Sequence, residues 1–313
     1  MLPIVHSNRR EFLARAAALG AAGLAAPQWL ASAADGPKPW QIGCYTRPWA
    51  AYELGVAFDA IAEAGFKHAG LMTTKSKAGA VIHTATTLDE ARRIGEQARK
   101  RGLELPSAWG DFSVQKSLQD GIAGLQHLLD VAAAAGVKSL LLGGIGSDDL
   151  YPRYCQVIAE CCDYAAQKHV ALTIKPHGGK NGAGPQLRKL IERVGRRNFS
   201  VFYDAGNILF YSHGTLDPVA DAATVDGLVS GWCIKDYRPP PKDAAPQQFG
   251  TVDLTPGTGQ VDFPAVFARL RKGGFSGGPL VVETLAPGTL PQLLVEAKKA
   301  RKFLEDLVRQ EKP

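Results

Sequence analysis

Short apolar and β-branched segments recur along the chain from Gln41 onward, and each is followed by a break rich in Gly, Asp or Asn. Helical stretches follow most of these segments, with apolar residues spaced by three and four positions, as in residues 88–101, 117–135, 151–168 and 291–309. This alternation is typical of βα units on a parallel sheet. The pattern predicts eight strands, at residues 41–48, 68–73, 103–109, 139–143, 171–177, 200–207, 231–237 and 279–284.

The number of repeats selects the fold class within the α/β proteins. A doubly wound sheet usually has fewer strands, so eight βα units favour a single closed (β/α)8 barrel, the TIM barrel, over residues 34–313. One long irregular segment, residues 238–261, carries three consecutive prolines and follows the seventh expected strand. A barrel places its active-site loops at such positions.

The first 33 residues have the pattern of a targeting segment. The paired Arg9 and Arg10 precede Phe12-Leu13, an alanine-rich stretch over residues 16–26, and the small residues Ala31-Ser32-Ala33. This order resembles a twin-arginine export signal, which implies cleavage after Ala33 and delivery to the periplasm. An amphipathic N-terminal helix is the alternative. The apolar stretch is far shorter than the roughly 20 residues of a membrane-spanning helix, so no stable membrane anchor is expected.

Composition and charge exclude several classes of protein. Hydrophobic residues make up 45% of the chain and charged residues 21%, which is typical of a globular protein with a sizeable core. The formal net charge is +6, but the longest basic run, residues 99–101, stands alone, so nucleic-acid binding is not expected. The five cysteines are an odd number, which argues against a complete disulfide framework. Cys155, Cys161 and Cys162 lie in a helical pattern and are expected in the core.

Polar residues close several of the expected strands. In a barrel of parallel strands, functional side chains stand at the carboxyl ends, and ionisable groups there are costly to bury unless they share a site. We therefore expect them to converge. Trp49 and Trp109, which also close strands, are either walls for the apolar face of a sugar ring or ordinary packing residues. The polar strand ends are Thr46-Arg47-Pro48-Trp49, Trp109-Gly110-Asp111, Lys175-Pro176-His177, Asp204-Ala205-Gly206-Asn207, Lys235-Asp236 and Glu283.

Four segments together resemble the sugar phosphate isomerase/epimerase family, which has a xylose isomerase-like barrel. The resemblance implies one divalent cation, held by a Glu on the fifth strand, an Asp on the sixth, a His on the seventh and a Glu on the eighth. It also implies that the cation polarises a sugar carbonyl while acidic groups move a proton between adjacent carbons. The four segments are Tyr203-Asp204-Ala205-Gly206-Asn207, Cys233-Ile234-Lys235-Asp236, Gly257-Thr258-Gly259-Gln260-Val261-Asp262-Phe263 and Gly278-Pro279-Leu280-Val281-Val282-Glu283.

The chain departs from the family pattern at two of the four ligand positions. Asp204 and Glu283 match, but Lys175 stands in place of the fifth-strand Glu and Cys233 in place of the seventh-strand His. His177, two residues after Lys175, points to the same side of the strand and is the substitute ligand that we expect. His177, Asp204 and Glu283 would suit Mn²⁺, Zn²⁺, Fe²⁺ or Mg²⁺. The alternatives are that His177 caps the break before Gly178 and that Cys233 is a core residue.

Together with the export signal, the resemblance implies an exported isomerase or epimerase that acts on a carbohydrate through a metal-stabilised enediolate. Glu283 is then the base as well as a ligand, and Lys175 or Lys235 stabilises the developing oxyanion. We expect Asn207 and Asp236 to bind substrate together with the two tryptophans.

Two other readings of the site stay open. The missing fifth-strand Glu leaves room for a lyase or hydratase that acts on keto-sugars or keto-glycosides. A non-catalytic carbohydrate-binding barrel, with Lys175 in the cation's place, is the further alternative. Lys175 is either neutral beside the metal, where it can take a proton from the substrate, or it stays charged against Asp204 or Glu283 while His177 holds the metal farther out. We expect the second, because pairing a buried ammonium with a carboxylate costs less than removing its proton beside a cation. Nothing in the sequence indicates the oligomeric state.

Overall fold

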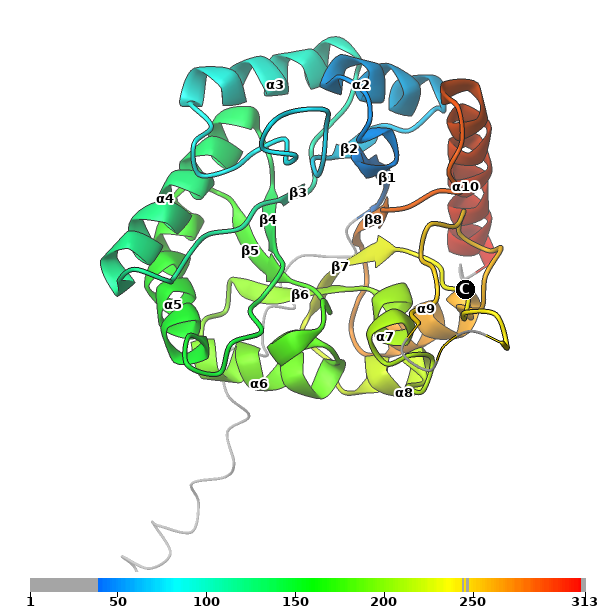
Figure 1. The fold of residues 1–313 in the computed structure, drawn as a ribbon. Helices are drawn as coiled ribbons and strands as arrows, with labels where there is room; N and C mark the ends of the chain where they lie inside the picture. The colour runs from blue at the N-terminus through cyan, green and yellow to red at the C-terminus, as the bar shows by residue number, and fades with distance from the viewer. Residues whose placement is uncertain (1–38, 244, 246–247, 311–313) are drawn as a thin grey trace, which may run out of the picture. The chain divides into compact units, whose positions relative to one another are not determined.

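Eight parallel strands form the centre of the computed structural model, which describes residues 39–243, 245 and 248–310 (Figure 1). The strands neighbour one another in the order β2-β1-β8-β7-β6-β5-β4-β3. Isolated parallel bridges, His68 to Glu104 and Leu71 to Ala108, join the two ends of this sheet and close it. The predicted (β/α)8 barrel is therefore confirmed. The strands are β1 (Trp40–Tyr45), β2 (His68–Gly70), β3 (Ala108–Trp109), β4 (Ser139–Leu142), β5 (Ala171–Ile174), β6 (Phe199–Tyr203), β7 (Val229–Ile234) and β8 (Gly278–Val282).

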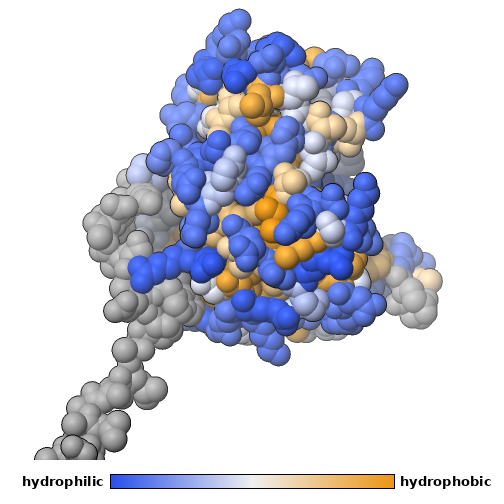
Figure 2. Space-filling view, turned by 90° about the vertical axis from the view of Figure 1, so that its left-hand side faces the viewer, coloured by the Kyte–Doolittle hydropathy of each residue, from blue (hydrophilic) through white to orange (hydrophobic). Residues whose placement is uncertain are grey.

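Helices surround the strands and cover the outer face of the barrel (Figure 1). Four helices had their bounds predicted from the sequence, and the observed helices agree to within one residue at each end. The predicted bounds are 88–101, 117–135, 151–168 and 291–309. Figure 2, which looks onto the side that carries α4 and α5, shows mostly hydrophilic residues with smaller hydrophobic groups between them. The helices are α2 (Leu54–Glu63), α3 (Leu88–Lys100), α4 (Leu118–Ala135), α5 (Tyr151–Gln167), α6 (Gly184–Val194), α7 (Ala205–Tyr211), α8 (Pro218–Ala223), α9 (Phe263–Lys272) and α10 (Leu290–Gln310), with short 3-10 turns η2 (Arg47–Trp49) and η3 (Gly179–Asn181).

Most of the predicted strands extend too far at their carboxyl ends. The strand expected at 200–207 ends at Tyr203, because the carboxylate of Asp204 accepts a hydrogen bond from the backbone N–H of Asn207 and begins α7. The strand expected at 171–177 likewise ends at Ile174, directly before Lys175. The third strand, expected at residues 103–109, contains only Ala108 and Trp109. Pro106 lies in the expected part that is not a strand, and it has no N–H group to donate to a neighbouring strand. The polar strand ends are thus loops and helix starts.

A layer of apolar side chains fills the barrel next to these strand ends. Tyr45, Leu141, Phe202, Cys233 and Val281 come from five different strands and pack together with Met72. Cys233 therefore belongs to the core, as one reading of the sequence predicted. All five cysteines are buried and free, which agrees with the expectation that they form no disulfide framework.

Three expectations concern the export signal, a membrane anchor and the loop after β7. The export signal predicted at residues 1–33 lies outside the described residues and stays a prediction. Among the described helices, none is long and apolar enough to cross a membrane. Residues 238–261 contain no helix or strand in their described part, as predicted for a long loop after β7.

Candidate active site: a buried cluster of lysines and carboxylates

Four ionisable side chains stand at the carboxyl ends of consecutive strands. Lys175 directly follows β5, Asp204 follows β6, Lys235 follows β7 and Glu283 follows β8. Because the strands are parallel, these positions lie at the same end of the barrel. All four side chains are at most 2% exposed and contact one another through ion pairs. The predicted convergence of strand-end charges is confirmed for these four residues.

Glu283 receives more positive charge than any other group in this cluster. The Nζ atom of Lys175 donates to its Oε2 at 2.5 Å, while Oε1 lies 2.6 Å from Nζ of Lys235 and 2.7 Å from Nη1 of Arg47. Burial alone would raise the pKa of Glu283, but the three cations outweigh it and hold the pKa well below its ordinary value. Glu283 is therefore ionised and a weak proton acceptor, which disfavours its predicted role as the base.

Asp204 is held more loosely than Glu283. Its Oδ2 atom lies 3.5 Å from Nζ of Lys175 and 3.4 Å from Nζ of Lys235, and its Oδ1 accepts the N–H of Asn207 at 2.9 Å. Burial raises the pKa of Asp204 above its ordinary value, although Lys235 and Lys175 oppose this. Asp204 is thus the carboxylate of the cluster with the greater affinity for a proton.

Lys175 keeps its proton in this setting. Burial opposes its charge, but Glu283, Cys233 and Asp204 together raise the pKa of Lys175 above its ordinary value. Lys175 lies against both carboxylates, the two partners that the sequence suggested for it.

Arg47 is a member of the cluster whose role the sequence did not identify. It lies in η2 after β1 and links Glu283 to Asp253, whose Oδ1 is 3.6 Å from its Nη2. Its side chain is 34% exposed, whereas Glu283 is 1% exposed. Arg47 therefore connects the buried charges to the solvent-facing side. The signal available in the sequence was its place in the polar segment that closes the first strand.

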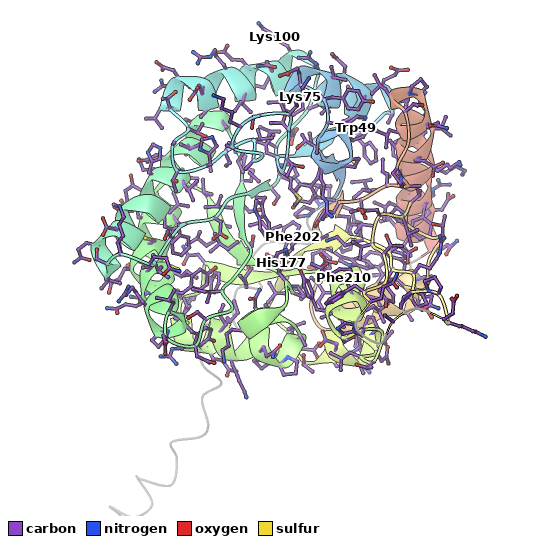
Figure 3. All side chains as sticks on the ribbon, in the orientation of Figure 1. Trp49, Lys75, Lys100, His177, Phe202 and Phe210 are labelled. Carbon is purple, nitrogen blue, oxygen red and sulfur yellow. The ribbon has the colours of Figure 1, made fainter. Side chains whose placement is uncertain are left out.

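Three rings lie together beside the lysine of β5. The ring of His177 is 5.2 Å from that of Trp109 and 5.5 Å from that of Tyr211, and Nζ of Lys175 is 5.2 Å from the Trp109 ring. Figure 3 shows His177 within the ring of helices. His177 is exposed, but partial desolvation by the groups around its ring, followed by the charge of Lys175, lowers its pKa to about 4, so the imidazole is neutral at neutral pH. Tyr211 is a second residue that sequence reasoning missed.

Three residues predicted to bind substrate pack against or hydrogen-bond to other parts of the protein: Trp49, Asn207 and Asp236. Trp49 is fully buried, so it is a packing residue and presents no ring face at the surface. The side chain of Asn207 accepts a hydrogen bond from Lys235 and donates one to the carbonyl oxygen of Pro176, and so it orients the lysine. Substrate binding by Asn207 stays a prediction.

Asp236 holds the loop that precedes α9. Its Oδ2 accepts the N–H groups of Gly257 and Gly259, and its Oδ1 accepts those of Tyr237 and Val261. A Cβ atom at Gly259 would lie 2.3 Å from Oδ1 of Asp236, which explains why this position is glycine. The four backbone groups occupy both oxygens, so the observed role of Asp236 is to fix the Gly257–Val261 segment.

Asp204, Cys233 and Glu283 have ligand atoms within 4.8 Å of one another, and on distance alone this triad could bind a metal ion. His177, the expected third ligand, is not in that group. However, ammonium groups already contact both carboxylates of the triad, and the thiol of Cys233 packs in the apolar layer. A divalent ion would have to share these oxygens with two cations. As arranged, the cluster does not fit a divalent cation.

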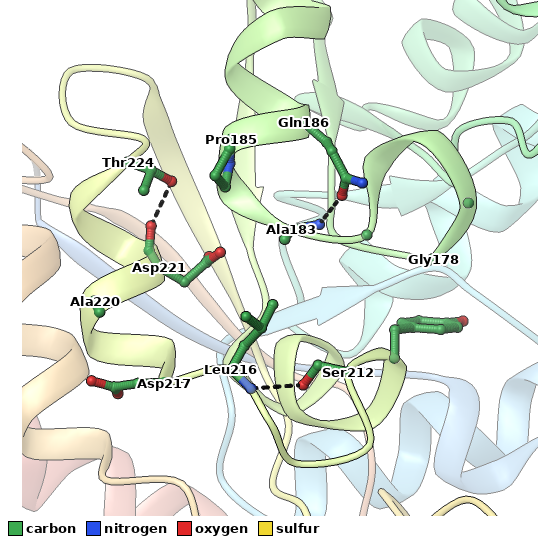
Figure 4. Close-up of a pocket in the computed structure, with 13 residues that line it drawn as sticks. Gly178, Ala183, Pro185, Gln186, Ser212, Leu216, Asp217, Ala220, Asp221 and Thr224 are labelled. Atoms are coloured by element: carbon green, nitrogen blue, oxygen red, sulfur yellow. Dashed lines mark hydrogen bonds between the residues drawn. The ribbon is translucent and has the colours of Figure 1, made fainter. Parts of the chain in front are cut away.

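A pocket of about 690 Å³ lies beside the aromatic rings (Figure 4). It is bounded by the start of α6 and by α7 and α8, and Tyr211 lines it together with Gly178 and Ser212. Lys175, Asp204, Lys235 and Glu283 do not line this pocket. Tyr211 thus lines this pocket and also lies with its ring beside that of His177.

Comparisons with known proteins identify related folds. The model of the family described as the xylose isomerase-like TIM barrel matches residues 58–307, which bears out the resemblance inferred from the sequence. No curated protein matches the chain. Similar solved structures include a xylose isomerase domain protein from Planctomyces limnophilus, with 20% identity and a TM-score of 0.68 over 87% of this chain and 98% of that chain.

Two further structures are those of sugar epimerases. A D-psicose 3-epimerase, solved in the presence of D-fructose, is 15% identical with a TM-score of 0.61, over 85% of this chain and 97% of that one. A 3-keto-D-glucoside 4-epimerase from E. coli is 14% identical with a TM-score of 0.63, over 85% and 99%. At these identities the likeness shows a shared fold.

Proposed function

The chain belongs to the xylose isomerase-like TIM barrel family, and from this premise we propose that it is an enzyme that moves a proton next to a carbonyl group of a carbohydrate. The observation that carries the proposal is the cluster of two lysines and two carboxylates buried at the carboxyl ends of β5 to β8. Buried charges are costly, and their gathering at the catalytic end of a barrel is typical of an active site.

The side chains of the cluster divide the work in this proposal. Asp204 takes up the proton, because its carboxylate has a raised pKa and its Oδ2 lies 3.5 and 3.4 Å from the two lysines, farther than the oxygens of Glu283 do. Lys175 has three N–H groups and contacts two carboxylate oxygens, so one donor remains for a substrate oxygen that gains negative charge. Glu283 is the anion that holds the two lysines and Arg47 in place.

A single proton-accepting carboxylate favours some reactions over others. Epimerisation at one carbon needs a group on each face of that carbon, whereas isomerisation between neighbouring carbons can use one base. Elimination of a substituent from the next carbon also begins with one abstraction. Because Glu283 is held ionised by three cations, we favour isomerisation or a lyase reaction over two-base epimerisation.

The aromatic residues beside the cluster and the related structures support one substrate class. Trp109 and Tyr211 offer aromatic surface for the apolar face of a sugar ring, and the neutral imidazole of His177 can both donate and accept hydrogen bonds with hydroxyl groups. The similar epimerases act on keto-sugars or keto-glucosides according to their names. Keto-sugars and 3-keto-glycosides are accordingly the proposed substrates.

Proton exchange at carbon tests this function. The protein is incubated in heavy water with a panel of aldo sugars, keto sugars and 3-keto-glycosides, and deuterium at the carbon next to the carbonyl is measured by NMR. We expect exchange with at least one of these sugars and its loss in Asp204→Asn, with the fold retained by circular dichroism. Saturable sugar binding without exchange would instead indicate the non-catalytic binding barrel.

Export to the periplasm is a separate proposal, supported by Arg9-Arg10 and by Ala31-Ser32-Ala33. Replacing both arginines with lysine should leave an uncleaved precursor in the cytoplasm, as judged by fractionation and by the mass of the protein. A double variant that is still delivered and cleaved normally would exclude the twin-arginine route.

A further inference from the structure

The two lysines of the cluster stand where a cation would have to bind. Nζ of Lys175 lies 2.5 Å from one oxygen of Glu283, and Nζ of Lys235 lies 2.6 Å from the other. Both ammonium groups also approach Oδ2 of Asp204, at 3.5 and 3.4 Å. Oδ1 of Asp204 accepts the N–H of Asn207. Each carboxylate oxygen of the two acids thus has a donor from the protein itself.

The positive charges of the cluster already outnumber its negative charges without an ion. Arg47, Lys175 and Lys235 carry three positive charges, and Asp204 and Glu283 carry two negative ones, so the net charge is +1. A divalent ion among the same groups would raise the net charge to +3 in a region where four of the five side chains are at most 2% exposed. Repulsion between like charges is weakly screened in such surroundings.

The lysines also have little freedom to move aside. Nζ of Lys235 is held by Oδ1 of Asn207 at 3.1 Å, and that amide is itself fixed to the carbonyl oxygen of Pro176. Nζ of Lys175 lies 5.2 Å from the Trp109 ring, within cation–π distance.

We infer that the ammonium groups of Lys175 and Lys235 replace the divalent cation of this barrel, so that the chain holds no metal at the cluster. The positive charge that a metal would supply is then built into the protein at the ends of β5 and β7. This inference concerns metal content and is independent of whether the chain acts on a sugar.

One substitution at Lys175 should allow the cluster to bind a divalent ion. Lys175→Glu changes the net charge of the cluster from +1 to −1, and one divalent ion then restores +1. It also adds a carboxylate beside Asp204 and Glu283. Lys175→Gln is the matched control, because it removes the positive charge without adding a carboxylate. Lys180→Glu makes the same change of charge at a partly exposed lysine that pairs with Asp148.

The experiment measures bound metal by mass spectrometry after loading with Mn²⁺ or Zn²⁺ and dialysis into metal-free buffer. We expect the parent and Lys180→Glu to retain less than about a tenth of an ion per chain, and Lys175→Glu to retain about one. Lys175→Gln should retain less than Lys175→Glu. In the same samples, Mn²⁺ should raise the melting temperature of Lys175→Glu only.

The parent protein decides the inference even if Lys175→Glu fails to fold. A parent that retains about one ion per chain and melts at a lower temperature with EDTA would overturn it. A folded Lys175→Glu that retains no metal would also overturn it, since Lys175 would then not be what keeps the ion out. This experiment measures metal content and melting temperature, and hydrogen exchange in a sugar is a separate assay. A protein that is metal-free but inactive would therefore refute the proposed function and leave this inference standing.

Discussion

Removing the ammonium of Lys175 should destabilise the fold by about 3 kcal/mol. In Lys175→Met, the side chain keeps its volume but leaves Glu283 and Asp204 without their partner at 2.5 and 3.5 Å. Breaking a buried ion pair by removing one member typically costs roughly 3–5 kcal/mol. The lower end applies because Lys235 still contacts both carboxylates and Arg47 still contacts Glu283.

Urea unfolding of a double-mutant cycle measures this contribution. The cycle contains Lys175→Met, Glu283→Gln and the double variant, and the coupling free energy between the two positions should be at least about 1.5 kcal/mol. Lys180→Met is the control, because its pair with Asp148 is largely exposed and exposed pairs contribute about 0–1 kcal/mol. A loss below about 1 kcal/mol in Lys175→Met, or a coupling near zero, would refute the electrostatic account of the cluster.

Two further predictions concern single carboxylates outside this pair. Asp111 is exposed but lines a hollow with Phe112 and Tyr154, and partial desolvation there raises its pKa to about 6, although the N–H of Phe112 opposes the shift. The folded state then favours the protonated form, so the stability of the parent falls as pH rises from about 4 to 6. Asp111→Asn should therefore raise the melting temperature relative to the parent at pH 8 and leave it nearly unchanged at pH 4; equal effects at both pH values would contradict this. Asp236→Ala leaves four backbone N–H groups without their acceptor and should cost about 2–4 kcal/mol in urea unfolding, whereas Asp236→Asn, which keeps one acceptor oxygen, should cost less. Equal stability of the parent and Asp236→Ala would show that the Gly257–Val261 segment is held by other contacts.

The barrel could be predicted from sequence because each strand and helix leaves its own periodic signal. Eight apolar runs alternating with helical patterns leave few other arrangements, and local signals such as Thr87 with Glu90 mark helix starts. The carboxyl ends of the strands could not be placed in the same way. Asp204 has the backbone of a helix cap, and that choice depends on α7 packing after β6, which no run of apolar residues records.

The sequence predicts which residues come together at the site better than it predicts what each of them does. Parallel strands bring Lys175, Asp204, Lys235 and Glu283 together wherever the loops run, so their convergence follows from the fold. Which acid accepts a proton depends on how many cations contact it. Arg47, which contacts Glu283, lies 236 positions before it in the sequence, so the sequence pattern does not reveal this contact. The role of Asp236 depends in the same way on where the Gly257–Val261 segment lies.

The central claim is that this cluster moves a proton beside a sugar carbonyl with lysines in place of a metal. Deuterium incorporation from heavy water into a keto-sugar or 3-keto-glycoside, by protein that has been treated with EDTA and shown to be metal-free, tests it most directly. We predict exchange at the same rate before and after EDTA treatment, and none above background in Asp204→Asn. Exchange that disappears with EDTA and returns with Mn²⁺ or Zn²⁺, or no exchange with any sugar of the panel, would contradict the claim.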